Sequence, residues 1–148
     1  MDYKNGKIYR LVCNVSGKQY VGSTTQPLSK RKSTHKANYN QWKNNNRGYT
    51  SSFEIIDGGN CDIVLIENYP CSNKEELHAR ERFFIESVEC VNKNIPTRTK
   101  KEYIQDNKQH IQQIYTEWEN KNRDKRNEQR RNRYDPEKRR LRYLGARG

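Results

Sequence analysis

Two tyrosine-containing triplets near the start of the chain hold the residues whose types could support chemistry. They are Lys-Ile-Tyr at 7–9 and Tyr-Val-Gly at 20–22, separated by ten residues. A free phenol ionises near pH 10, so it acts as a base near neutral pH only where cations or a metal ion favour its ionised form. Candidate cations in the sequence are Lys7, Lys18 and Arg31.

A charged helix is predicted after the second triplet, from about Pro27 to about Trp42, because proline suits the first helical turn and three asparagines follow. Successive residues of a helix turn by about 100°, so four residues of this segment fall on one narrow face, which is expected to be buried. Two cations lie on either side of this stripe. An arginine beside such a stripe is usually an extended surface side chain. The stripe is Leu28, His35, Tyr39 and Trp42, and the cations are Arg31 and Lys32.

Glu81 lies on a second predicted helix, which starts with a capping box at 72–75 and runs to about Glu89. It points within about 40° of the apolar face formed by Leu77, Phe84 and Val88. Burial of an unpaired carboxylate costs several kcal/mol. Glu81 is therefore expected to pair with a cation such as Arg31, to bind a metal ion, or to sit at the rim of the core.

The remaining elements are short. Apolar residues around the two triplets predict two strands joined by a turn at 14–18. An irregular or helical segment is expected at 50–56, followed by a turn at 57–59 and a fully buried, central third strand at 63–66. The fold class is α/β (α+β): a three-stranded antiparallel sheet flanked by helices.

In order and spacing, these residues resemble the GIY-YIG nuclease family from about residue 6 to residue 96. The matches are the two triplets, Arg31 with His35, Glu81, and Asn94 after the second helix. The sequence departs from the family at Lys7, which replaces the first glycine although Gly6 precedes it, and at Val21, which replaces an isoleucine. Lys7 leaves open whether the backbone approaches closely there, and its charge would suit a phosphate-binding cleft.

The resemblance implies a magnesium-dependent DNA endonuclease, with Mn²⁺ as a substitute ion. It assigns Tyr9 as general base, Tyr20 as the residue that positions the water or contacts phosphate, and Arg31 as the stabiliser of transition-state charge. Glu81 becomes the metal ligand. His35 would contact phosphate or assist the leaving group, with a packed structural histidine as the alternative.

Positive charge is distributed unevenly along the chain. Residues 97–148 carry +8 of the net charge of +12, so we expect a catalytic domain at 1–96 and a basic, helix-prone or partly disordered DNA-binding tail at 97–148. In composition, the tail resembles the basic, helix-prone extensions of GIY-YIG proteins of large DNA viruses and mobile elements, so a homing or mobile-element-like role is expected. The residues expected to contact DNA or phosphate are Lys7, Lys18, Lys32, Asn94, Arg130, Arg131, Arg139 and Arg140.

Two other functions stay open. A noncatalytic DNA- or RNA-binding protein could retain the same fold, and Lys7 is the departure that favours it. A thin apolar stripe from Ile104 to Trp118, on a helix expected at about 100–121, could instead support self-association.

The four cysteines lack a Cys-x-x-Cys pair, so reduced thiols are expected. No apolar run reaches the roughly 18 residues of a membrane span, and the start lacks a signal-peptide pattern. The expected location is intracellular, in the cytoplasm or nucleus of a host, with no membrane partner.

Overall fold

The computed structural model describes residues 2–134 and residue 136. The chain divides into two compact units, Met1–Arg98 and Thr99–Gly148, and each is described by itself. Among the helices that the structure describes, none is both long and apolar enough to cross a membrane.

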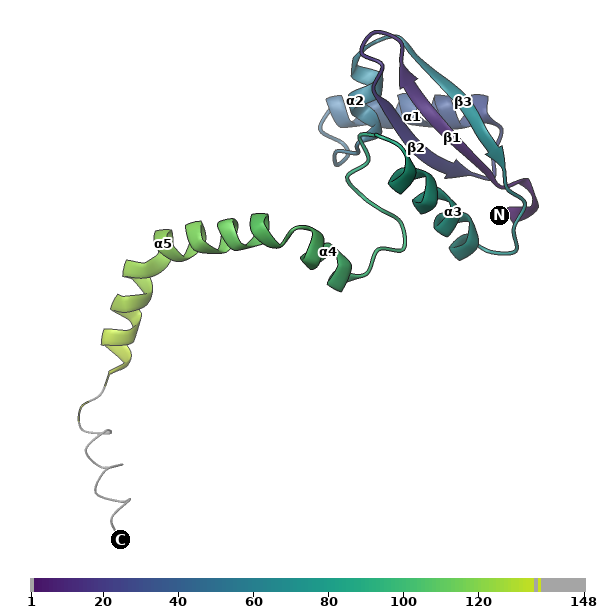
Figure 1. Ribbon diagram of the computed structural model, residues 1–148. Helices are drawn as coiled ribbons and strands as arrows, with labels where there is room; N and C mark the ends of the chain where they lie inside the picture. The colour runs from purple at the N-terminus through teal and green to yellow at the C-terminus, as the bar shows by residue number, and fades with distance from the viewer. Residues whose placement is uncertain (1, 135, 137–148) are drawn as a thin grey trace. The chain divides into compact units, whose positions relative to one another are not determined.

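The first unit contains a three-stranded antiparallel sheet with the order β2-β1-β3 (Figure 1). The strands are β1 (Lys7–Cys13), β2 (Gln19–Thr24) and β3 (Cys61–Asn68). The register of the β1–β2 hairpin places Tyr9 opposite Gly22. The predicted hairpin and the predicted α+β fold are both confirmed.

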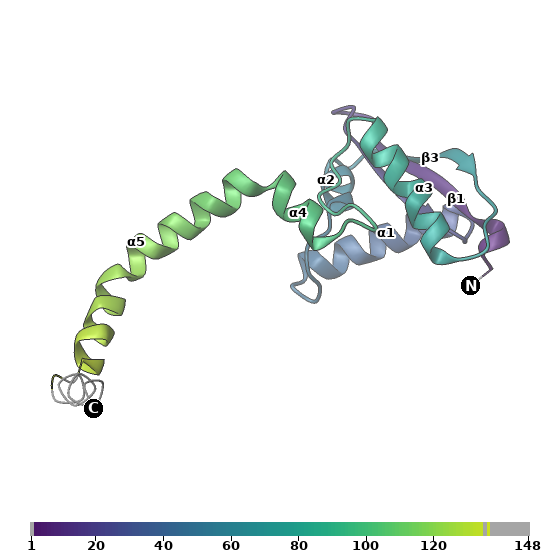
Figure 2. The same cartoon turned by 60° about the horizontal axis from the view of Figure 1, so that its bottom comes forward.

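Helices cover both faces of this sheet (Figures 1 and 2). Tyr9 and Leu11 pack with residues of α1 (Leu28–Lys43) and α2 (Ser52–Asp57). Ile8 and Val21 pack against α3 (Lys74–Ser87) on the other face. The alternation of side chains along β1 therefore feeds two small cores, one on each side of the sheet.

The predicted place of the third strand is wrong. β3 is an edge strand, β1 is central, and Val64 and Leu65 of β3 are each 40% exposed. A run of β-branched and apolar residues is typical of a doubly covered strand, but the helices here cover mainly β1 and β2. Hairpin pairing occupies one edge of β1 and leaves its other edge for β3.

The boundaries of the long helices differ slightly from the prediction. α1 begins after Pro27, as expected. The N-cap of α3 is Asn73, one residue later than predicted, and its Oδ1 accepts from the Glu76 N–H. The Glu76 carboxylate accepts from the Ser72 N–H rather than from the N-cap N–H, so the predicted capping box is not formed. α3 also ends at Ser87 rather than near Glu89.

The part of the second unit that the structure describes is helical. The helix expected at about 100–121 is two helices, α4 (Lys100–Asp106) and α5 (Lys108–Arg133), separated at Asn107. A capping box at Thr99 starts α4, and the Asn107 side chain bonds the Tyr103 carbonyl where α4 ends. α5 also continues past the predicted end of the helix at about residue 121, since Lys, Arg, Glu and Gln are good helix formers.

Candidate active site

A buried hydrogen-bonded trio joins β1 to α1. The Tyr9 hydroxyl oxygen lies 2.8 Å from Arg31 Nε, which donates to it, and 2.7 Å from His35 Nε2. Tyr9 is 0% exposed, so water does not compete for its hydroxyl. Arg31 and His35 are one helical turn apart and therefore face the same strand. The structure thus brings together three of the five predicted catalytic side chains.

Gly22 makes room for the trio. A Cβ atom at this position would lie 2.6 Å from the Tyr9 hydroxyl oxygen and 3.1 Å from Cε1 of Tyr20. Real Cβ atoms do not approach other atoms so closely, so a side chain here would displace the phenol. The glycine that ends the second triplet is required because Tyr9 reaches across β2 at that residue.

His35 is held as a neutral imidazole. Burial, reinforced by the positive charge of Arg31, lowers the pKa of His35 to about 3. Because Arg31 donates to the Tyr9 oxygen, we assign the phenolic proton to the bond toward His35 Nε2. The remaining ring proton is then on Nδ1, which lies 3.2 Å from Ser52 Oγ.

Ser52 was missed by the sequence analysis. It is 2% exposed and stands at the first position of α2, whose segment was expected to be irregular or helical. Its hydroxyl can accept the Nδ1 proton and so fix the tautomer in which Nε2 is free to accept. No pattern in the sequence pairs a serine at 52 with a histidine at 35.

Tyr20 lies against the imidazole of His35. The two rings meet edge to face with centroids 5.8 Å apart. Burial raises the pKa of Tyr20 well above its usual value, and Tyr9 adds to the effect. Burial likewise raises the pKa of Tyr9, although Arg31 opposes it. Both phenols are therefore neutral near pH 7, and neither is a preformed phenolate.

Glu81 faces the core side of α3, as predicted, and is 8% exposed. The Ser23 hydroxyl donates to its carboxylate at 2.5 Å. Burial raises the pKa of Glu81, and the Ser23 hydrogen bond is the largest effect that opposes this. The carboxylate also raises the pKa of Tyr9 and Tyr20, which places it in the same electrostatic site.

The residues around Glu81 fit a magnesium ion. Carboxylate and hydroxyl oxygens are hard ligands, and Mg²⁺ commonly uses one or two carboxylates while water and substrate oxygens fill its other positions. In the part of the chain that the structure describes, no group of three or more His, Cys, Asp or Glu residues could hold a metal. Glu81 would therefore act as a single carboxylate ligand, rather than as part of a closed protein cage.

Three of the cations predicted to contact DNA are engaged by other protein groups. The Lys7 ammonium donates to the Asn5 carbonyl at 2.8 Å. Lys18 pairs with Glu54 at 2.6 Å and Lys32 with Asp62 at 3.1 Å. Such exposed contacts are weak, so they neither support nor exclude binding of these three cations to phosphate. Their contact with DNA stays a prediction.

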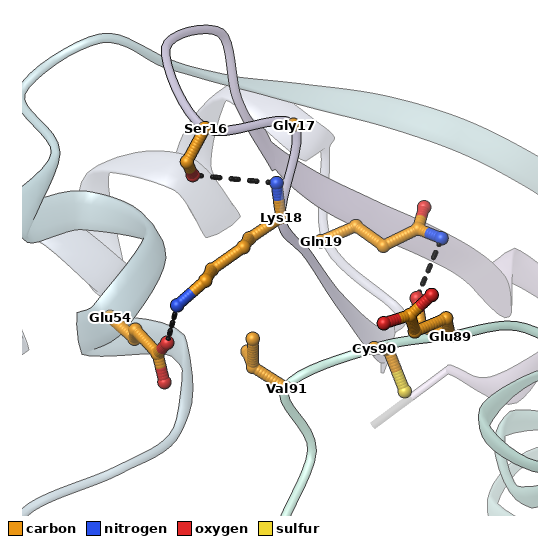
Figure 3. A pocket seen from close by; sticks show the side chains of 8 residues that line it. All are labelled: Ser16, Gly17, Lys18, Gln19, Glu54, Glu89, Cys90 and Val91. Atoms are coloured by element: carbon orange, nitrogen blue, oxygen red, sulfur yellow. Dashed lines mark hydrogen bonds and ion pairs between the residues drawn. The ribbon is translucent and has the colours of Figure 1, made fainter.

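The Lys18–Glu54 pair borders a cavity of about 400 Å³ between the β1–β2 hairpin, α2 and the segment after α3 (Figure 3). Gln19 and Glu89 also line this cavity, and the Gln19 amide donates to the Glu89 carbonyl. Two carboxylates face one ammonium there, which disfavours a phosphate. The cavity is separate from the Tyr9 trio.

An asparagine that the sequence analysis passed over holds β2 in place. The Asn92 side chain accepts from the Val21 N–H at 2.9 Å and donates to the Val21 carbonyl at 2.8 Å. Asn94, which was expected to hold backbone or substrate, is exposed. Its contact with DNA stays a prediction.

The four arginines of the tail that are predicted to contact DNA are distant in sequence from this site. Arg130 and Arg131 are exposed on α5. Arg139 and Arg140 lie outside the described residues.

Comparisons with known proteins identify the domain. The family model for the GIY-YIG catalytic domain matches residues 5–94. Among solved structures, a mutant of the catalytic domain of the intron endonuclease I-TevI is similar at 20% identity and a TM-score of 0.46, covering 64% of this chain and 96% of that one. A comparison with curated proteins found no match.

Proposed function

The chain belongs to the GIY-YIG family, and on that basis we propose that it is a magnesium-dependent endonuclease that hydrolyses phosphodiester bonds of DNA. The observation that carries the proposal is the buried Tyr9 hydroxyl, bonded at once to a permanent cation and to a neutral imidazole. The phenol thus has an acceptor for its proton and a cation beside its oxygen, so this arrangement can move a proton.

A neutral phenol is a weak base, and proton transfer from Tyr9 to His35 would remove the need for a preformed phenolate. Tyr9 is fully buried in the free protein, so the attacking water would have to reach its hydroxyl once DNA is bound. As Tyr9 takes a proton from that water, it would pass its own proton to Nε2 of His35. A neutral phenol can act in this way only if the imidazole takes up its proton. Arg31 helps to lower the pKa of His35 to about 3, so the negative charge of a phosphate bound near Arg31 would have to raise that pKa during the reaction. The Arg31 guanidinium stabilises negative charge on the phenol oxygen during the transfer.

Arg31 has further donors beyond the Nε that binds Tyr9. A guanidinium presents five N–H groups in a planar fork, so those not used by Tyr9 can bind the oxygens of a phosphoryl group. Tyr20, which packs on the same imidazole, keeps the ring in place and offers a neutral hydroxyl as a donor to phosphate.

Glu81 and the Ser23 hydroxyl are the groups that would hold Mg²⁺, with Mn²⁺ as a substitute. A bound ion would polarise the phosphoryl oxygens and neutralise developing charge. In its absence, burial favours the protonated form of the Glu81 carboxyl, so metal binding and proton release are coupled.

Lys7, which replaces the first glycine of the family motif, is weaker evidence against catalysis than the sequence alone indicated. Close backbone approach occurs at Gly6, where a Cβ atom would lie 2.2 Å from the Tyr69 carbonyl oxygen. The glycine needed at the start of β1 is therefore present one residue earlier. A homing or mobile-element role is the part of the proposal that rests on the basic composition of the tail alone.

The test is nicking of supercoiled plasmid by the full chain with and without Mg²⁺, comparing the parent with Glu81→Gln at protein concentrations that give equal DNA binding. Glu86→Gln is the matched control, because Glu86 lies on the same helix but bonds Arg82 at the surface. Metal-dependent nicking that Glu81→Gln loses and Glu86→Gln keeps supports the nuclease. A parent that binds DNA and leaves plasmid and branched DNA intact with Mg²⁺ or Mn²⁺ supports the noncatalytic alternative.

A further inference from the structure

One face of α5 is built from amide, hydroxyl and guanidinium side chains over almost the whole length of the helix. At about 100° per residue, these residues fall within about 60° of a common direction. All are exposed, and Asp124 is the acidic residue that shares the face. The members of this polar face are Gln109, Gln112, Gln113, Thr116, Asn120, Arg123, Asn127, Arg130 and Arg131.

Charge is distributed unevenly along α5. Residues 108–120 hold one basic and two acidic residues, whereas residues 121–133 hold seven basic and two acidic residues, a net charge of +5. The amides are concentrated in the first half of the polar face and the arginines in the second half. A helix selected merely for solubility would have no reason to separate these two kinds of group.

We propose that α5 is a recognition helix that binds duplex DNA, with the amide half of its polar face against base edges in the major groove and its arginines against phosphates. This proposal rests on the proposed function, which makes DNA the substrate. It adds that the sequence preference of the protein comes from α5.

The chemistry of the face fits this partner. Asn and Gln side chains pair in a bidentate manner with N6 and N7 of adenine, and a helix 10–12 Å across fits a major groove about 12 Å wide. Internal bonds leave donors free: the Gln113 amide donates to Glu117, and the Thr116 hydroxyl donates to the Gln112 carbonyl. The arginines of the second half can replace counterions along the phosphate backbone.

The opposite face of α5 is apolar in its first half, where Ile111, Ile114 and Trp118 are found. Arg126 stacks over the Trp118 ring at 5.4 Å and pairs with Glu119, so this side is partly covered by its own helix. Ile111 and Trp118 are seven residues apart, so this apolar face spans about one heptad, fewer than a stable coiled coil requires. DNA is therefore favoured over a second copy as the partner of α5.

The experiment is selection of the full chain on duplexes with a randomised 20-base-pair segment, in buffer with EDTA so that no cleavage occurs. The parent is compared with Asn120→Ala and with Gln129→Ala. Position 129 is nine residues from 120 and lies on the opposite side of the helix, so Gln129 is a matched amide control.

We expect the parent to enrich a sequence motif, and Asn120→Ala to relax the preference at one position by about 10-fold without changing the salt dependence. Gln129→Ala should behave as the parent. Arg130→Ala combined with Arg131→Ala should weaken binding to every sequence and lower the slope of log affinity against log salt by about 2.

Three results would overturn the proposal. The parent could enrich no motif, Asn120→Ala and Gln129→Ala could act alike, or the chain could prefer single-stranded DNA or RNA to duplexes. Dimerisation in sedimentation that Ile111→Ser abolishes together with duplex binding would assign the helix to self-association instead. Since no cleavage is measured, a failure here is distinct from a failure of the nuclease proposal.

Discussion

The Tyr9 hydroxyl depends on a chain of hydrogen bonds that reaches from Arg31 through His35 to Ser52. Each member settles the proton of the next: Arg31 can only donate, so the phenol donates to Nε2, and the imidazole donates from Nδ1 to the serine. The direction in which a proton can leave Tyr9 is thus set by Arg31 on α1, together with Ser52 on α2, which fixes the tautomer of His35.

Ser52→Ala should slow cleavage by about 10-fold while leaving DNA affinity unchanged. Loss of one hydrogen bond worth about 1 kcal/mol lets His35 adopt the tautomer with its proton on Nε2, which cannot accept from Tyr9. The measurement is single-turnover cleavage together with ¹⁵N NMR of the His35 ring, whose shifts report the protonated nitrogen.

Ser51→Ala is the control, because Ser51 is the adjacent buried serine but its hydroxyl accepts from the Lys93 N–H instead of bonding the histidine. A tautomer that stays unchanged in Ser52→Ala would show that Ser52 acts through packing alone.

The depressed pKa of His35 predicts a pH dependence of folding. Between about pH 6.5 and the folded pKa of about 3, the unfolded chain binds a proton at His35 that the native state refuses. This contribution to the free energy of unfolding is therefore full above pH 6.5 and falls as the pH is lowered, by about 2 kcal/mol at pH 5. Urea unfolding of the parent and of His35→Gln from pH 5 to pH 8 measures it.

The variant should lose that slope, whereas the contribution of Glu81, whose pKa is raised by burial, has the opposite sign and is common to both proteins. Parallel curves for parent and variant would mean that His35 takes up its proton in the native state as readily as in the unfolded chain.

Candidate site residues could be chosen from the sequence, whereas the residues that support them were missed. The structure brings Tyr9, Arg31 and His35 into hydrogen-bonding contact, and their catalytic roles stay predictions. Ser52 and Asn92 act through hydrogen bonds that cross between elements, and no periodicity along one segment records such a bond.

At the scale of elements, the β1–β2 hairpin fixes the site, because its register puts Gly22 opposite Tyr9. Gly22→Ala should abolish most cleavage and reduce the free energy of unfolding by about 1–3 kcal/mol, since the added methyl group collides with the Tyr9 hydroxyl. Thermal unfolding and plasmid nicking test both effects.

Gly48→Ala makes the same chemical change where no atom lies within 4 Å of the new Cβ. It should retain activity and stability. If Gly22→Ala and Gly48→Ala have equal effects, a collision with Tyr9 is not the reason why the second triplet ends in glycine.

Element types were easier to predict than element neighbours. Alternation and turn residues predicted the hairpin, and helical periodicity predicted α1 and α3. The sequence misplaced β3, because the apolar run Ile63–Ile66 has the composition of a covered strand while its position depends on which edge of β1 remains free. α5 extends further than predicted because helix propensity in a charged segment does not depend on burial.

For the whole molecule, the division at Arg98 separates the buried core from the most basic part of the chain. Every residue of the two core clusters lies before position 96, and the tail from 97 holds +8 of the net charge of +12. The core and most of the positive charge therefore lie in different segments of the chain.

A chain that ends at Arg98 should keep its thermal unfolding transition and bind duplex DNA more weakly, with a smaller salt slope than the full chain. Calorimetry and fluorescence titration at several salt concentrations measure the two properties. Loss of the cooperative transition on truncation would show that the tail contributes to the core.

The most direct test of the account is a double-variant cycle on Mg²⁺-dependent plasmid nicking with the parent, Tyr9→Phe, His35→Gln and the combined variant. If the two residues pass one proton between them, each single change should slow single-turnover nicking by about 100-fold or more, and the double variant should be no slower than the worse single one. A parent that does not cut, or losses that multiply in the double variant, would contradict the account.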